Sequence, residues 1–340
     1  MVFLSQGIRG LIAAVLLCAG IMPAQANDSM AEIGAGGLVL ARSDLIAMEK
    51  ETLYLSMDEV RVDYVFRNDS DRVIETVVAF PMPDIKVDPY GGDWAIPRYE
   101  DNFLGFSVEA GGRRIEPRLQ QRAYAAGVDV TAMLEVAGIG LSPLDDFGSP
   151  IDTSGLSQAA IADLVARGVV FANRDAATGR YIDPVEPAWT LKTTYWWTMT
   201  FPANAEIAVR HRYQPAVGGS AGLFFLTGDP AQPVDSGYVQ DYCMDRSFLN
   251  AVERRQKTAD ANSIGYTEAR LSYVLTTGAN WAGPIGDFRL VVDKGSTKNL
   301  VSFCGEGVKK TGPTTFEMRK KDFWPERDMH VLFVVGHSLQ

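Results

Sequence analysis

Residues 59–66 read EVRVDYVF, a run in which apolar and charged side chains alternate. The even positions from Val60 to Phe66 are apolar, and the odd positions from Glu59 to Asp63 are charged. Since successive side chains of a strand point to opposite faces of its sheet, this pattern predicts a β-strand with one buried face.

The same alternation returns in later segments that are separated by turn residues. The segments are 74–80, 104–108, 191–201 and 207–213, and further strands are expected at 271–277, 288–292, 300–304 and 316–318 and at 329–335, which is nearly continuous in apolar residues. Runs of this kind, broken by Gly, Pro, Asn and Asp, are typical of antiparallel sheets. We therefore predict a mainly β fold with two antiparallel β-sandwich-like domains, at residues 27–120 and 186–340.

A helical insert is expected between the two sandwiches, at residues 121–185. Ser157 can cap a helix whose apolar residues share one face, and Gly168 can end it. Within the second sandwich, Asp245 or Ser247 can cap a further short helix. The predicted division of the chain is 1–26, 27–120, 121–185 and 186–340.

The strands at 191–201 and 207–213 follow each other closely, which predicts a hairpin. In the register that pairs their facing ends, Trp197 lies opposite His211. Trp196 then lies beside Arg212 on the outer face of the sheet.

The charge balance limits the classes of partner. The 340 residues carry 32 Lys and Arg against 42 Asp and Glu, a formal net charge of −10. Nucleic acids and anionic lipid surfaces are bound through basic patches, so this balance argues against both.

The first 26 residues have the features of a secretory signal peptide. Arg9 precedes the apolar run LIAAVLLCA at residues 11–19, and Ala24-Gln25-Ala26 forms an A-x-A site. The apolar run is shorter than the roughly 20 residues that a membrane-spanning helix needs. We expect cleavage after Ala26, a periplasmic location, and no transmembrane segment after cleavage.

Cleavage after Ala26 removes Cys18 and leaves Cys243 and Cys304. An even pair in an oxidising compartment is most simply one disulfide. A reactive or metal-binding pair is the alternative, but neither cysteine lies in a C-x-x-C motif or beside a histidine.

Residues 218–222, GGSAG, match the nucleophile elbow G-x-S-x-G of serine hydrolases. That elbow joins a strand to a helix, whereas Ser220 follows a Pro/Gly loop, so a flexible loop is preferred. The three histidines show no metal-ligand spacing, and His211 and His330 fall within apolar strand patterns. We therefore predict no catalytic residue, no metal site and no cofactor.

Trp196 lies on the polar side of a Thr-rich strand, where a flat aromatic ring can stack on a sugar or contact a partner protein. Trp94 can present a second aromatic from the loop YGGDW at residues 90–94. We name Trp196, Arg212 and Trp94 as candidate ligand-binding residues. The alternatives are that the helical insert covers both tryptophans, or that Arg212 only stacks on Trp196.

Several blocks of the sequence resemble one bacterial family. The blocks include NDS at 27–29, AFPMP at 79–83, YWW at 195–197, DYC at 241–243, NWAGPIG at 280–286 and SFC at 302–304. They are similar to the domain-of-unknown-function family numbered forty-four twenty-four, found in secreted proteobacterial proteins. The resemblance covers the whole mature chain and implies a periplasmic location and the pairing of Cys243 with Cys304. It implies no established activity and no catalytic residues.

These features together predict an exported, non-enzymatic binding or interaction module of the cell envelope, whose partner is an envelope protein or a glycan. The expected binding surfaces are the face with Trp196 and the loops near Trp94 and Trp281. A hydrolase acting on an envelope polymer is the alternative. A scaffold component without a small ligand is a third reading.

Overall fold

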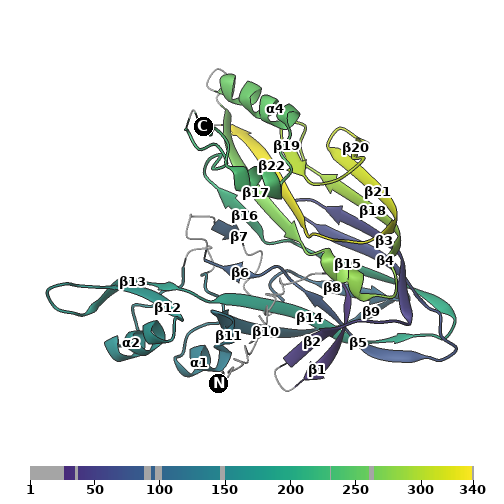
Figure 1. Ribbon diagram of the computed structural model, residues 1–340, viewed down its shortest axis with the longest axis horizontal. Helices are drawn as coiled ribbons and strands as arrows, with labels where there is room; N and C mark the ends of the chain where they lie inside the picture. The colour runs from purple at the N-terminus through teal and green to yellow at the C-terminus, as the bar shows by residue number, and fades with distance from the viewer. Residues whose placement is uncertain are drawn as a thin grey trace, which may run out of the picture.

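The computed structural model describes residues 27–34, 37–87, 93–95, 102–145, 150–229, 231–259 and 264–338. These residues form three large β-sheets, a separate two-stranded sheet and four short α-helices (Figure 1). The mainly β fold that the alternating pattern predicts is confirmed.

Sheet A has seven strands in the order β11-β10-β14-β5-β1-β2, with β6 beside β14. They are β1 (Ser29–Gly34), β2 (Gly37–Ala41), β5 (Ile74–Pro81), β6 (Ile85–Lys86), β10 (Arg118–Ala125), β11 (Val128–Asp129) and β14 (Thr190–Phe201). Its ladders are antiparallel. Large side chains such as Phe80, Tyr195 and Trp197 fill its inner face.

Sheet B has eight strands in the order β20-β21-β18-β3-β4-β15-β8-β9. They are β3 (Ile46–Leu55), β4 (Val60–Asn68), β8 (Ser107–Ala110), β9 (Arg113–Ile115), β15 (Ala205–Tyr213), β18 (Ile285–Asp293), β20 (Lys309–Lys310) and β21 (Thr315–Phe323). β3 and β18 run parallel, with Leu53 opposite Leu290. Along β4, buried and half-buried residues alternate without a break, as the pattern at 59–66 predicts.

Sheet C has five strands in the order β19-β22-β17-β16-β7. They are β7 (Asp93–Ala95), β16 (Val217–Ser220), β17 (Ile264–Tyr273), β19 (Leu300–Phe303) and β22 (Met329–Ser338). The helices α3 (Ser236–Asp241) and α4 (Arg246–Lys257) cover its outer face, and Asp245 caps α4 as expected. β22 is therefore buried from Val331 to Val334, as its nearly continuous apolar sequence predicts.

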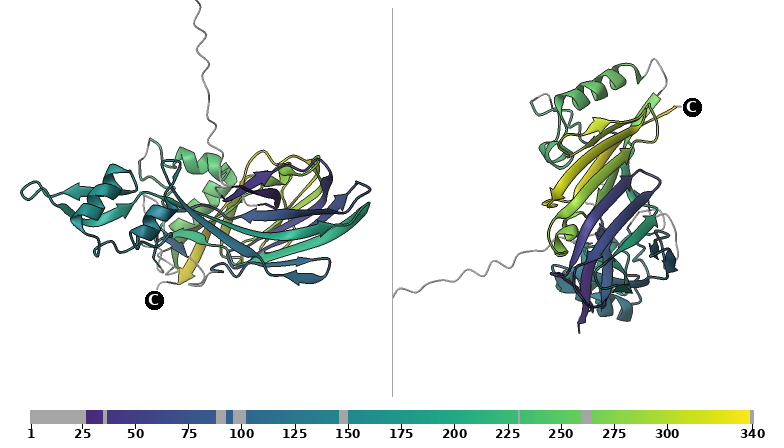
Figure 2. Two further views of the ribbon diagram at one scale, coloured as in Figure 1. Left: turned by 90° about the horizontal axis from the view of Figure 1, so that it is seen from below. Right: turned by 90° about the vertical axis from the view of Figure 1, so that its right-hand side faces the viewer.

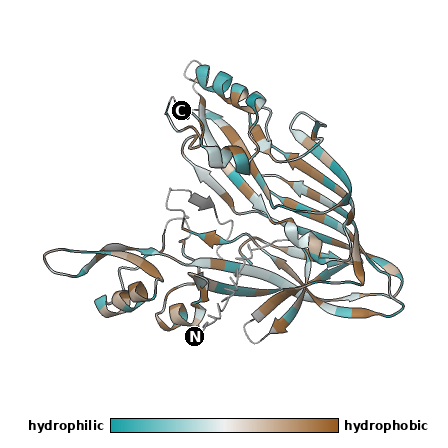
Figure 3. Ribbon diagram, in the orientation of Figure 1, coloured by the Kyte–Doolittle hydropathy of each residue, from teal (hydrophilic) through white to brown (hydrophobic). Residues whose placement is uncertain are grey.

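The main core lies between the inner face of sheet B and the inner faces of sheets A and C. Phe66 on β4, Phe80 on β5 and Phe288 on β18 all lie in this core, so segments that are distant in the sequence share it. Figure 3 shows the hydrophobic and hydrophilic residues alternating along many of these strands. The short helix η1 (Thr276–Asn280) and Trp281 close one side of this core.

The expected helical insert forms a smaller core of its own at one end of the molecule (Figures 1 and 2). It comprises α1 (Thr131–Val136), α2 (Gln158–Ala166), β12 (Val170–Arg174) and β13 (Tyr181–Pro187). The Ser157 side chain accepts a hydrogen bond from the Ala160 amide, 3.1 Å away, so Ser157 caps α2 as predicted. Gly168 follows the helix with a φ of +69°, which favours glycine.

The predicted hairpin of residues 191–201 and 207–213 is wrong. β14 belongs to sheet A and β15 to sheet B, and residues 202–204 lead the chain from one sheet to the other. The expected contact of Trp197 with His211 exists, with ring centroids 5.2 Å apart, but it spans the two facing sheets. Each of the two strands has one apolar face, and both of these faces are buried because the strands pack against each other across the core.

The two expected sandwiches are not separate sheets in the structure. Residues 27–120 and 186–340 both contribute strands to sheets A, B and C. β4 pairs with β15 and β3 pairs with β18, so the first and last parts of the chain form sheet B together. Alternation along a strand fixes which side chains are buried, but it does not identify the neighbouring strand.

Cys243 and Cys304 form a disulfide, as the cysteine count predicts. Cys243 lies between α3 and α4, and Cys304 directly follows β19. The bond therefore fastens the helices to the edge of sheet C.

Removing this bond should destabilise the fold. The cysteines are 61 residues apart, and closing a loop of that length stabilises a fold by about 4 kcal/mol in the chain-entropy model. We expect the double variant Cys243→Ser/Cys304→Ser to lose most of that amount from its free energy of unfolding in urea. Reductant should lower the stability of the wild type and leave the double variant unchanged; equal responses would contradict the prediction.

Candidate functional site

The three residues that the sequence suggests for binding lie on three different sheets. Trp196 is on β14 of sheet A, Arg212 on β15 of sheet B, and Trp94 on β7 of sheet C. The expected neighbourhood of Trp196 and Arg212 is wrong, because β14 and β15 are not paired. The guanidinium carbon of Arg118, on the neighbouring strand β10, lies 4.9 Å from the centre of the partly exposed Trp196 ring instead.

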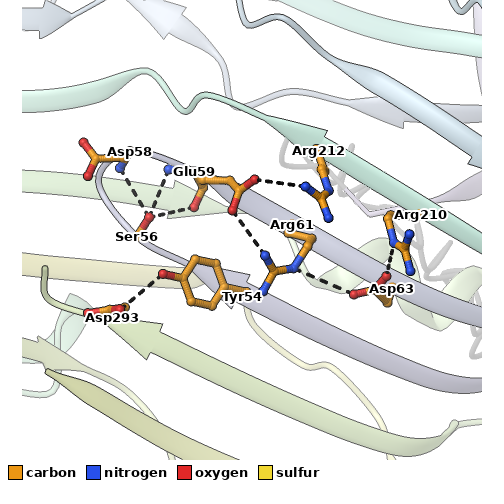
Figure 4. A network of polar contacts seen from close by, with 9 residues as sticks. All are labelled: Tyr54, Ser56, Asp58, Glu59, Arg61, Asp63, Arg210, Arg212 and Asp293. Carbon is orange, nitrogen blue, oxygen red and sulfur yellow. Dashed lines mark hydrogen bonds and ion pairs between the residues drawn. The ribbon is translucent and has the colours of Figure 1, made fainter. Parts of the chain in front are cut away.

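Arg212 belongs to a charged network on the outer face of sheet B (Figure 4). It lies directly opposite Arg61, and both guanidinium groups approach the Glu59 carboxylate, at 3.9 Å and 3.3 Å. Arg210 pairs with Asp63 at 2.6 Å on the same face. Exposed pairs of this kind contribute up to about 1 kcal/mol each, so the network mainly fixes the positions of its side chains.

The other two predicted surfaces lie near Trp94 and Trp281. The backbone of Trp94 pairs with Gly218 of β16, while its side chain and residues 88–92 lie outside the described residues. The Trp281 side chain is 2% exposed and its Nε1 donates to the Asp28 carbonyl oxygen at 2.7 Å, whereas Gly283 in the loop that follows it is exposed.

Ser220 ends the antiparallel strand β16, so it does not have the strand-to-helix setting of a nucleophile elbow. Its hydroxyl donates to the Gly222 carbonyl oxygen at 3.0 Å. His330 lies opposite Ser272, further along β17, and its Nδ1 is 2.9 Å from the Ser272 hydroxyl. Among the described residues, no group of three or more His, Cys, Asp or Glu side chains is arranged to hold a metal ion.

The structure contains a groove where sheets B and C separate at one edge, which we call the edge groove. Its volume is about 720 Å³, within the range of small-molecule sites. The apolar side chains lining it are Phe248, Leu275, Val301, Phe303, Val308, Phe316, Met318, Phe323, Trp324 and Met329. Most come from β19, β21 and the segments next to them, while Phe248 comes from α4, Leu275 from the segment between β17 and η1, and Met329 from β22.

The groove exists because the two edge regions are not joined by backbone hydrogen bonds. β19 is the edge strand of sheet C, and β20 and β21 end sheet B. Val301 and Phe303 point from β19 toward the core, while Phe316 and Met318 do so from β21. The inner faces of both sheets are thus reachable through this opening.

Charged groups surround the opening with nearly balanced charge. They are the carboxylates of Asp245, Glu306 and Glu326 and the cations of Lys320 and Arg327. Lys320 pairs with Glu306 at 2.6 Å, and Arg327 donates to the carbonyl oxygens of Gln240 and Asp241 at 3.4 Å each. The disulfide forms part of the same wall.

The edge groove is not predicted by any pattern in the sequence. Its lining is made of alternating strand residues that look like ordinary core positions. The one local signal is Trp324, a large aromatic placed directly after β21 and 48% exposed. An opening between two sheets depends on how their edges diverge, and that is a tertiary property.

Residues 26–332 match the family described as "Domain of unknown function (DUF4424)", and the chain belongs to that family. No curated protein matches the sequence. A crystal structure from Legionella pneumophila subsp. pneumophila str. Philadelphia 1, described as a "putative nutrient binding protein", resembles this chain at a TM-score of 0.42 and 14% sequence identity. That match covers 92% of this chain and 71% of the other. Among the described residues, no helix is long and apolar enough to cross a bilayer.

The adjacent tryptophans 196 and 197 should respond differently to truncation. Trp197 is 2% exposed in the core, so Trp197→Ala should cost about 3–5 kcal/mol in the free energy of unfolding. Trp196 is partly exposed and stacks on Arg118, so Trp196→Ala should cost about 1–2 kcal/mol. Urea unfolding of both variants checks this, and equal losses would contradict the assignment of faces.

Proposed function

We propose that this DUF4424 protein is an exported, non-enzymatic binding module of the cell envelope that holds a small amphiphile in the edge groove. The observation that carries the proposal is the groove itself, a large apolar opening with a polar margin. Sites for small molecules commonly combine an apolar lining with a few polar groups that orient the ligand.

The composition of the groove favours one class of ligand. Its aliphatic and aromatic lining suits a single acyl or alkyl chain, which gains free energy from leaving water. Its margin carries three carboxylates and two cations, and Lys320 is already paired with Glu306. A strongly charged head group would meet like charges there, so the ligand's polar end is uncharged, as in a glycerol or sugar ester.

Export is supported by independent features of the chain. The signal-like segment ends at Ala26, and the family match begins at residue 26. A disulfide at Cys243 and Cys304 suits an oxidising compartment such as the periplasm. We therefore place the mature protein in the periplasm, beginning at Asn27.

Ligand binding can be measured with N-phenyl-1-naphthylamine, an uncharged probe that fluoresces in apolar sites. We expect the mature protein to bind the probe and monolauroyl glycerol to displace it. Trp324→Glu introduces a charge at the groove and should weaken both ligands at least about tenfold, or 1.4 kcal/mol. Phe171→Glu is the matched control, because Phe171 is 65% exposed on β12, outside the groove, and should bind as the wild type does.

Two results would contradict the amphiphile proposal. One is equal probe binding by the wild type and Trp324→Glu. The other is a thermal shift with an acyl-free glycan or a peptide but none with monolauroyl glycerol, which would identify a different class of partner.

The location is tested separately, on protein released from the periplasm of expressing cells. Edman sequencing should return Asn27 as the first residue. A different first residue, or a protein that stays in the cytoplasm, would contradict export with cleavage after Ala26.

A further inference from the structure

The residues directly after the expected cleavage site are buried in the core. Asn27, Asp28 and Ser29 are each 0% exposed. The Asn27 backbone nitrogen donates to the Thr277 hydroxyl at 2.6 Å, and that hydroxyl donates to the Asn27 carbonyl oxygen at 2.8 Å. Trp281 bonds the next carbonyl oxygen, that of Asp28, at 2.7 Å. The helix η1 and Trp281 therefore hold this segment by its backbone.

The Asn27 side chain is held equally closely. Its Nδ2 lies 3.2 Å from Oε2 of Glu51, and its Oδ1 accepts from the Tyr64 hydroxyl at 2.5 Å. Glu51 faces the core because a register shift between Met48 and Lys50 interrupts the alternation of β3. The β-bulge thus places a carboxyl group beside residue 27.

Glu51 and Asp28 are two buried acids whose like charges would repel each other. Burial raises the pKa of both groups, that of Glu51 to about 8. Nε2 of His211 lies 3.5 Å from an oxygen of the Asp28 carboxyl group, but burial lowers the pKa of His211 to about 3, so its ring is neutral. Among the described residues, no Lys or Arg forms an ion pair with either acid, and neither Asp28 oxygen has a hydrogen-bond partner. Without a nearby positive charge, burial favours the protonated, neutral form of such acids, and a nearby positive charge favours the carboxylate form.

We infer that the α-ammonium group of Asn27, created by cleavage after Ala26, is the counter-ion of the Asp28–Glu51 pair. This inference rests on the cleavage site in the proposed function. Water hydrolyses the Ala26–Asn27 amide, leaving a carboxylate on Ala26 and an amine on Asn27 that binds a proton. The new charge arises on a nitrogen that is already 2.6 Å from the Thr277 hydroxyl, in the residue whose side chain contacts Glu51.

The surrounding residues are fitted closely to this segment. A Cβ atom at Gly278 would lie 2.8 Å from Nδ2 of Asn27 and 3.1 Å from Cδ1 of Ile285. A side chain at position 278 would therefore displace Asn27. Processing therefore does more than release the protein: it completes a charged site in the core. An unprocessed chain has an amide at the same position and gains no such compensation.

The pH dependence follows from the acids. An acid whose pKa is raised on folding loses stability as pH rises, here from about 4.5, the ordinary value for Glu51, through about 8. An ammonium group favours the carboxylate, so the mature chain should lose less over that interval. The other titratable groups facing the pair are Tyr64, Tyr273 and His211; burial raises the pKa of both tyrosines, so all three stay neutral between pH 5 and 8.

The test compares two purified proteins, one that begins at Asn27 and one with a single Gly before it. At pH 8 we expect the chain that begins at Asn27 to melt higher by about 5 °C or more, and at pH 5 the gap should shrink to about 1 °C. Glu51→Gln, made in both chains, should reduce the difference between their melting temperatures at pH 8. Glu49→Gln, a change at a partly exposed position of the same strand, should leave the gap as it is.

Equal melting temperatures of the two chains at pH 8 would overturn the inference. A gap that persists at pH 5 and in Glu51→Gln would also overturn it, because it would reflect the added bulk rather than charge. These measurements use purified chains of defined first residue, so they are independent of where the cell cleaves the precursor and of whether the edge groove binds an amphiphile.

Discussion

The parallel ladder between β3 and β18 is the constraint on which the other layers depend. It joins a strand from the first sixth of the chain to one near its end, and so makes sheet B continuous. Sheets A and C both pack against the inner face of sheet B, and neither has an independent core of comparable size. The buried N-terminal segment, the closing Trp281 and the edge groove all lie around this shared layer.

Local features of the fold could be predicted from the sequence because they depend on neighbouring residues. The alternation at 59–66, the apolar run of β22 and the caps Ser157 and Asp245 were visible without tertiary information. The assignment of strands to sheets was not visible. A strand with one apolar face satisfies the same pattern whether its partner lies beside it or across the core, which is why β14 and β15 were wrongly paired.

For the candidate sites too, the face on which a residue lies could be predicted from the sequence, but its contacts with distant segments could not. Trp196 and Arg212 were correctly expected on outer faces, but their sheets are different, so they form no common site. The blocks at 27–29 and 280–286 carried the family resemblance, and the structure shows that they contact each other. Asp28 and Trp281 are 253 positions apart in a sequence that offers no local sign of their contact, and the edge groove likewise combines strands from two sheets.

The β3–β18 ladder also affects how the chain must fold while it is being made. Tyr54 and Asp293 are hydrogen-bonded although they are 239 residues apart, so a long wait separates the synthesis of the two strands. During that wait β3 can pair with β4, but its other edge stays open, and open edges invite association with other chains. Sheet B therefore cannot be completed until β18 has been synthesised. A chaperone that keeps the emerging chain extended until β18 appears would protect it from aggregation.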